Sequence, residues 1–201
     1  MKTQIIGKEH IDFAVDALKK GESIAFKTDT IFGLSCLATD KNACQKLLQT
    51  KGREGKPLII LLGKNMKLKN YVKNIPQKIE KIISHFWPGP LTVIFELNYP
   101  FCNEITCGKS TIAIRVPNHE LTQQILEKLG APIVSTSANM TGEKSLNSED
   151  QIFSVFNGKI PYIVKCEEEK KSTSSTIISF SDNKIHILRE GSIKSQEFKN
   201  F

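Results

Sequence analysis

The strongest constraint on the fold is the alternation of helical and extended apolar segments along the whole chain. Residues 8–20 carry apolar side chains at helical spacing and end beside Gly21, whereas residues 57–62 form a short apolar run that is typical of a buried strand. Helical and extended segments that interleave in this way predict an α/β fold with a twisted, open, mixed sheet and flanking helices.

The same pattern indicates where the individual elements lie. Helices are expected over residues 8–20, 40–49, 76–86, 119–129 and 148–157. Strands are expected over residues 23–27, 57–62, 91–97, 111–116, 132–136, 175–181 and 184–189. Asp40 suits the N-cap of the second helix and Gly130 the end of the fourth, and the Trp-Pro-Gly-Pro sequence at 87–90 predicts a firm break.

Length and cysteine content narrow the class of protein. A chain of 201 residues favours one domain, here taken as residues 1–201. The longest aliphatic run, residues 58–62, is far shorter than the ~20 residues of a membrane helix, and the N-terminus lacks an apolar stretch of signal-peptide length. Five cysteines without a Cys-x-x-Cys pair favour reduced thiols, so we expect a cytoplasmic protein that does not bind membranes.

The basic residues are unevenly divided between lysine and arginine. Of the 28 basic residues only three are arginines, Arg53, Arg115 and Arg189, and the formal net charge is +7. Arginine is needed where a planar, forked donor must hold a carboxylate or a phosphate. The three arginines are therefore candidates for an anion-binding site, and a plain surface ion pair is the alternative for each of them.

Six polar segments interrupt or follow the expected strands. They cover residues 27–34, 51–58, 110–117, 135–145, 172–178 and 188–192, and three of them contain the three arginines. Strand ends are where α/β proteins build binding sites, and hydroxyls, backbone amides and cationic side chains together suit an anionic ligand. A turn or a helix cap would explain any one of these segments alone. Together they predict a shared pocket for phosphate and carboxylate groups.

Two other kinds of site are not supported by the sequence. Gly108-Lys109-Ser110 resembles the end of a phosphate-binding P-loop, but Asn103 stands where that motif needs its first glycine, and a strand rather than a helix is expected to follow. The four histidines are scattered, without metal-ligand spacing or an obvious nucleophile beside them. We therefore expect neither a protein-held metal nor a catalytic triad.

The polar segments together resemble the YrdC-like family of threonylcarbamoyl-AMP synthases. The resemblance lies in Lys-Thr-Asp-Thr-Ile-Phe-Gly-Leu at 27–34, Lys-Gly-Arg at 51–53, Ser-Ala-Asn at 137–139 and Ser-Thr-Ile at 175–177, and it runs from about residue 8 to about residue 193. It implies the YrdC-like fold in its short, single-domain form. The chain departs from the family pattern at Lys27, Phe32, Leu61 and Ser179.

The resemblance also implies an activity. Family members make threonylcarbamoyl-AMP and pyrophosphate from L-threonine, bicarbonate and ATP, and the product feeds the modification of the tRNA adenosine next to the anticodon. The implied partners are these small molecules and a downstream threonylcarbamoyl-transferase complex. Mg²⁺ is expected to arrive with ATP and to be held mainly by its phosphates, since no carboxylate cluster is visible.

By motif position, the resemblance assigns two sets of binding residues. The L-threonine set is Thr30, Leu61, Arg115, Ser135 and Ser175. The ATP set is Lys51, Arg53, Lys56, Thr111, Ser137, Asn139, Ser145 and Arg189, of which Lys51, Arg53, Ser137 and Asn139 are assigned to catalysis. Arg115 is expected to hold the threonine carboxylate as a fork. The alternative is a structural anion, an aspartate or glutamate from outside its strand.

Two further functions remain open at this point. A sequence pI of about 9.1 and the lysine-rich segment 64–81 favour a weak, salt-sensitive contact with tRNA or another RNA. They also admit an RNA-binding module, although no aromatic RNA-recognition motif is present. A carbamoyl-transfer relative shares the fold inside a much larger maturation protein, and the shortness of this chain argues against that reading.

Overall fold

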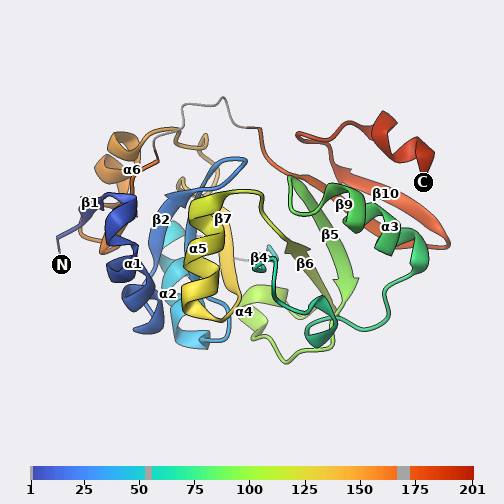
Figure 1. The fold of residues 1–201 in the computed structure, drawn as a ribbon. Coiled ribbons are helices and arrows are strands. Elements are labelled where there is room, and N and C mark those ends of the chain that lie inside the picture. The colour runs from blue at the N-terminus through green and yellow to red at the C-terminus, as the bar shows by residue number, and fades with distance from the viewer. Residues whose placement is uncertain (1, 53–55, 167–172) are drawn as a thin grey trace.

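Ten strands pair into one continuous mixed sheet in the computed structural model, which describes residues 2–52, 56–166 and 173–201 (Figure 1). The sheet order is β1-β8-β2-β3-β7-β4-β6-β5-β9-β10. The strands are β1 Gln4–Ile6, β2 Ile24–Lys27, β3 Phe32–Leu37, β4 Ile59–Leu61, β5 Leu91–Glu96, β6 Thr111–Arg115, β7 Ile133–Ser137, β8 Tyr162–Val164, β9 Thr176–Ser181 and β10 Lys184–Arg189. Parallel and antiparallel neighbours alternate irregularly, which confirms the expected open, mixed sheet.

Six α-helices flank the described part of the sheet. They are α1 Ile11–Lys19, α2 Lys41–Lys51, α3 Gln77–Phe86, α4 Asn103–Thr106, α5 Glu120–Leu129 and α6 Glu149–Phe156. Asp40 caps α2 as predicted, because its Oδ1 accepts hydrogen bonds from the amides of Asn42 at 2.8 Å and Ala43 at 3.1 Å. Gly130 ends α5 with a φ of 67°, a left-handed conformation that glycine adopts without strain.

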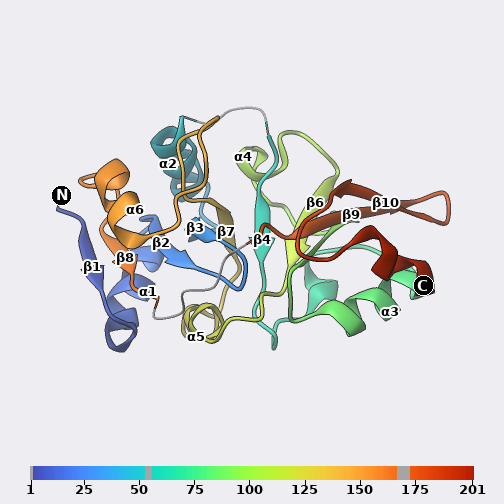
Figure 2. The same cartoon turned by 90° about the horizontal axis from the view of Figure 1, so that it is seen from above.

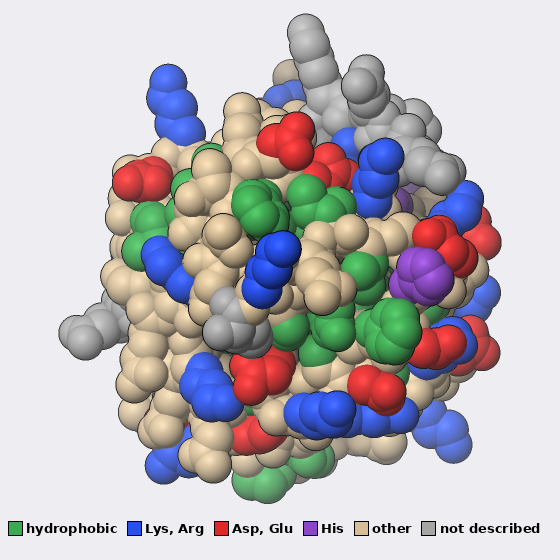
Figure 3. Space-filling view, turned by 90° about the vertical axis from the view of Figure 1, so that its left-hand side faces the viewer, with side chains coloured by type: hydrophobic (Ala, Val, Ile, Leu, Met, Phe, Trp, Pro, Cys, Tyr) green, Lys and Arg blue, Asp and Glu red, His purple; other side chains and the backbone are tan. Residues whose placement is uncertain are grey.

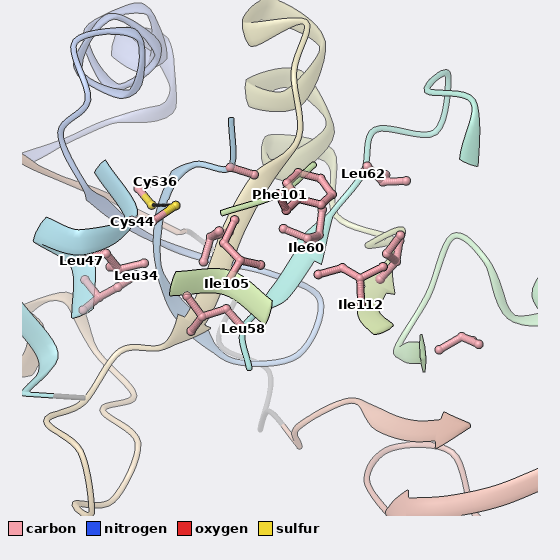
Figure 4. Close-up of a cluster of buried hydrophobic side chains, with 14 of the residues drawn as sticks. Leu34, Cys36, Cys44, Leu47, Leu58, Ile60, Leu62, Phe101, Ile105 and Ile112 are labelled. Carbon is pink, nitrogen blue, oxygen red and sulfur yellow. Dashed lines mark hydrogen bonds between the residues drawn. The ribbon is translucent and has the colours of Figure 1, made fainter. Parts of the chain in front are cut away.

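The helices divide between the two faces of the sheet. Helices α1 and α5 lie on one face and α2 and α4 on the other, as Figure 2 shows. The first face packs on a cluster that includes Leu18, Phe26 and Ile125. The second packs on a larger cluster, part of which is drawn in Figure 4, where Leu47 lies near Leu34 and Ile105 near Ile60. This double cover explains why β2 and β3 are buried on both faces.

The sequence pattern does not predict four of the helices and strands. Strands β1 and β8 have three residues each, too few for a periodicity. Helix α4 is a single turn. Strand β3 contains Gly33, Ser35 and Cys36, residues that favour strands weakly, so the pattern does not predict it although five of its six residues are buried.

The β1 end of the molecule shows hydrophobic side chains among lysines and acids (Figure 3). Ile5 on β1 and Phe13 on α1 are the large apolar residues exposed there. Phe13 lies 6.3 Å from the ring of Tyr162 and 5.9 Å from that of His10, so part of its surface is covered by stacking. Within the described residues, no helix has the length and apolar content to cross a bilayer, and no group of three metal-ligating side chains gathers.

Candidate active site

A cavity of about 350 Å³ opens on the same face of the sheet as α1 and α5, and its lining contains no residue of either helix. This volume lies within the range of small-molecule sites. Its floor consists of residues at every second position of neighbouring strands, because such residues share one face of a sheet. Strand pairing aligns Ala113 on β6 with Ile59 on β4 and Ile94 on β5, and Ile59 with Ser135 on β7. All four residues line the cavity.

The structure brings the whole predicted L-threonine set to this cavity. Its lining includes Thr30, Leu61, Arg115, Ser135 and Ser175. These residues come from five separate segments of the chain, so their convergence is a property of the fold and not of sequence proximity. Their contact with substrate remains a prediction.

Arg115 stands at the centre of a buried hydrogen-bond network. Its Nη1 donates to Thr30 Oγ1 at 2.6 Å, its Nε donates to the Gly89 carbonyl at 3.0 Å, and its Nη2 forms an ion pair with Asp29 Oδ1. The side chain is only 5% exposed. Three of the five guanidinium N–H donors are thus engaged, and the two others meet no hydrogen-bond acceptor among the described residues.

Asp29 supplies the structural anion that the sequence left open as the alternative partner of Arg115. It lies in the hairpin tip between β2 and β3, far along the chain from β6. The ion pair explains how an arginine is tolerated in an otherwise apolar strand. If Arg115 binds the substrate carboxylate, only its two remaining N–H donors can do so, because the other three are already engaged.

Arg189 reaches the same end of the cavity from β10. Its Nε and Nη2 donate to the Ser175 carbonyl at 3.1 and 2.9 Å, and Nη2 also contacts Ser175 Oγ at 3.0 Å. Ser175 Oγ is in turn 2.8 Å from Thr92 Oγ1. Arg189 is a predicted ATP-binding residue and Ser175 a predicted L-threonine-binding residue. Their hydrogen bonds show that Arg189 directly orients Ser175.

The two arginines make this end of the cavity strongly electropositive. Burial lowers the pKa of the Arg115 guanidinium, and the carboxylate of Asp29 opposes that shift. Burial, followed by the positive charge of Arg115, lowers the pKa of Arg189. Because Asp29 compensates one of the two charges, a further anion would be stabilised between them.

Lys51 and Asn139 form a second buried network next to Ser137. The Lys51 ammonium donates to the carbonyl oxygens of Ser137 and, at 2.8 Å, Asn139, and lies 3.4 Å from Asn139 Oδ1. Asn139 Nδ2 donates to the carbonyls of Met140 and Glu143 at 3.0 and 2.7 Å. Lys51 is 2% exposed, so its charge fixes the backbone that follows β7.

Only some of the other predicted ATP-binding residues lie at the cavity. Ser137 and Arg189 line the cavity, and Thr111 begins β6 on the same strand face as Ala113. Lys56 is exposed at the end of the loop before β4, and Ser145 lies in the loop after β7. Arg53 falls outside the described residues, so its assignment remains a prediction from the sequence.

Gly33 allows Ser135 to face the cavity. A Cβ at residue 33 would lie 2.5 Å from Ser135 Oγ and 3.4 Å from the Thr136 carbonyl. We therefore expect Gly33→Ala to destabilise the protein by about 1–3 kcal/mol through overpacking. Adding Ser135→Ala should recover much of this loss. Denaturant unfolding of the four proteins of this cycle measures the coupling, and strictly additive effects would contradict the predicted contact.

Several residues of the site were not recognised in the sequence. Asp29 was quoted in a motif but given no role, and Thr92 and the Gly89 carbonyl carried no polar pattern. Lys109 also lines the cavity, although the segment around it was set aside when the P-loop was rejected. That rejection is itself confirmed, because β6 follows the segment.

Comparison with known proteins places this geometry in a family. The family model Sua5/YciO/YrdC, described as "Telomere recombination", matches residues 16–191. The chain belongs to the Sua5/YciO/YrdC family. A threonylcarbamoyl-AMP synthase of Pyrococcus abyssi is 33% identical over 190 residues, which cover 94% of this chain and 56% of that protein. Another, from Idiomarina loihiensis, is 32% identical over 86% of this chain and 94% of its own length.

Solved structures of the Sua5/YciO/YrdC family confirm the fold. The crystal structure of P. abyssi Sua5 complexed with L-threonine superposes with a TM-score of 0.93 at 32% identity, covering 98% of this chain and 60% of that one. The chain thus spans little more than half the length of the Pyrococcus relatives. It shares with them the α/β domain and its open mixed sheet.

Proposed function

We propose that this protein is a threonylcarbamoyl-AMP synthase, which makes threonylcarbamoyl-AMP and pyrophosphate from L-threonine, bicarbonate and ATP. One observation carries the proposal. Residues from five segments, assigned to L-threonine by sequence position, line a single cavity. The similarity to relatives that carry this name, one of them solved with L-threonine, supports the assignment.

The first step suits the Arg115 end of the cavity. The neutral amine of threonine attacks the carbon of bicarbonate, water leaves, and a carbamate forms. The carboxylate would lie between Arg115 and Arg189, and the hydroxyls of Thr30, Ser135 and Ser175 would orient the amine and side chain. The apolar floor excludes water from the carbamate, which is unstable toward loss of CO2.

In the second step a carbamate oxygen attacks the α-phosphorus of ATP, and the bond to the β-phosphate oxygen breaks as pyrophosphate leaves. Such a transfer depends on positioning and on neutralising charge, and it requires no protein nucleophile. Ser137, which lines the cavity, and the backbone held by Lys51 would position the phosphates for this transfer. Magnesium enters with the triphosphate as part of the substrate.

Pyrophosphate release tests the proposal directly. With ATP present, we expect release to require both L-threonine and bicarbonate, and the carbamoyl adenylate to appear in equal amount. Incubation with ¹⁴C-bicarbonate followed by chromatography measures the adenylate. Cleavage of ATP at full rate without bicarbonate would refute the assignment.

The proposed product defines the further partners. A mixed anhydride of a carbamate and AMP is short-lived in water, so we expect a transferase that accepts it and modifies tRNA in the cytoplasm. The exposed lysines between residues 64 and 81 favour a weak, salt-sensitive contact with tRNA at most. If RNA binding were the main function, ATP and L-threonine would not raise the melting temperature of RNA-free protein.

A further inference from the structure

Lys109 is a cation at the cavity that neither the family motifs nor the proposed reaction uses. It lines the cavity together with Pro57 and Ser137, and its side chain is exposed. It precedes Arg115 by six residues, or about 20 Å of extended chain. Lys109 thus marks the end of the cavity opposite to the Arg115–Asp29 pair.

The backbone holds Lys109 at this place. Cys107 and Gly108 both adopt left-handed conformations, with φ of 51° and 74°, and turn the chain from α4 into β6. The Lys109 amide closes the turn on the Thr106 carbonyl at 3.2 Å. The Lys109 side chain therefore extends from a hydrogen-bonded turn.

The same turn is tied to the segment that carries the predicted phosphate-binding lysines. The Leu58 amide donates to the Ile105 carbonyl at 2.9 Å, which joins α4 to the chain just after Lys56. Gln45 Nε2, on the helix that ends in Lys51, donates to Glu104 Oε1 at 2.6 Å. These two contacts tie the helix that precedes Lys109 to Leu58 and to α2.

The charge of Lys109 is available to a ligand. No carboxylate pairs with it within the described residues, and Glu104, the acid closest to it in sequence, already accepts from Gln45. By contrast, the Arg115 charge is compensated by Asp29, and the Lys51 ammonium is buried on carbonyl oxygens. An exposed ammonium at a fixed turn suits the terminal phosphates of a nucleotide, which lie partly in solvent.

We propose that Lys109 binds the β- and γ-phosphates of ATP and the pyrophosphate that leaves. The inference rests on the proposed function, because it assigns one end of the cavity to the leaving group of that reaction. The attacking carbamate would then form at the Arg115 end, and the α-phosphate would lie over the apolar floor near Ala113 and Ile59. This arrangement places nucleophile and leaving group on opposite sides of the phosphorus, as in-line transfer requires.

Binding of phosphate chains tests Lys109 without relying on catalysis. Lys109→Met removes the charge and keeps an unbranched side chain of nearly the same length, and Lys109→Arg restores the charge. Lys184→Met, an exposed lysine in the β9–β10 hairpin, is the matched control. Titration calorimetry with inorganic tripolyphosphate and with AMP separates the terminal phosphates from the α-phosphate.

We expect Lys109→Met to weaken tripolyphosphate binding about tenfold, as for the loss of one charged hydrogen bond. AMP binding should change less than twofold, Lys109→Arg should recover most of the loss, and Lys184→Met should resemble wild type. Unchanged tripolyphosphate binding, or an equal loss of AMP binding, would overturn the proposal. Lys109-dependent binding in a protein that makes no carbamoyl adenylate would support the phosphate site and refute the proposed function.

Discussion

Arg115→Ala is expected to lower the free energy of unfolding by about 3–5 kcal/mol, because it leaves the Asp29 carboxylate buried without its counter-charge. The side chains of Arg115 and Asp29 are only 5% and 13% exposed, so water cannot replace the lost partner fully. For a chain of this length the loss corresponds to a fall of roughly 6–20 °C in melting temperature. Differential scanning calorimetry of the empty protein measures it.

Lys128→Ala is the matched control for this prediction. Lys128 Nζ lies 2.7 Å from Asp12 Oδ1, but these side chains are 46% and 72% exposed, and such a pair contributes less than about 1 kcal/mol. If Arg115→Ala were as stable as Lys128→Ala and only the threonine dependence of the rate changed, the ion pair would be structurally irrelevant. Loss of stability together with a raised threonine requirement would show that the guanidinium serves both the fold and the carboxylate.

The outline of the fold could be predicted because its long elements carry strong periodic signals. Helix α5 and its terminal Gly130, and α2 with its cap Asp40, follow from local chemistry alone. The centre of the sheet is less accessible to such reasoning. Strand β3 lies between β2 and β7, and burial on both faces lets small residues such as Gly33 and Cys36 occupy it without an alternating pattern.

The composition of the site could be predicted better than its connections. Scarcity of arginine pointed to Arg115 and Arg189, and both line the cavity. Which group each arginine contacts depends on pairing between strands that are distant in sequence. Nothing near Arg115 in the chain indicates Asp29, which is 86 residues away, and nothing near Lys51 indicates the carbonyls of Ser137 and Asn139.

Lys51 shows how far this matters for mechanism. In the sequence it belongs to a dense cationic segment that suggests direct contact with phosphates. In the structure its ammonium is buried among the carbonyl oxygens of Ser137 and Asn139, and its own carbonyl accepts from the Thr141 amide at 3.1 Å. The structure therefore gives Lys51 the role of holding the chain after β7 in place, and its part in ATP binding remains a prediction.

Lys51→Met is therefore expected to cost on the order of 2–4 kcal/mol of stability, because the buried Asn139 carbonyl loses its ammonium donor and the Ser137 carbonyl keeps only the Asn139 amide. We expect the segment after β7 to lose more protection than the rest of the protein. Hydrogen exchange of the amides between residues 138 and 146 should become faster than that of α5. Tripolyphosphate and AMP affinity should fall together, since Ser137 and Asn139 lose their common support.

Lys46→Met on the same helix provides the comparison. The Lys46 ammonium lies 3.3 Å from Glu22 Oε1 at the surface, with 55% of the side chain exposed, so its removal should change stability by less than about 1 kcal/mol. A direct phosphate contact by Lys51 makes a different prediction. The Lys51→Met protein would then keep its stability and its exchange rates and lose affinity for tripolyphosphate alone, which would contradict a positioning role.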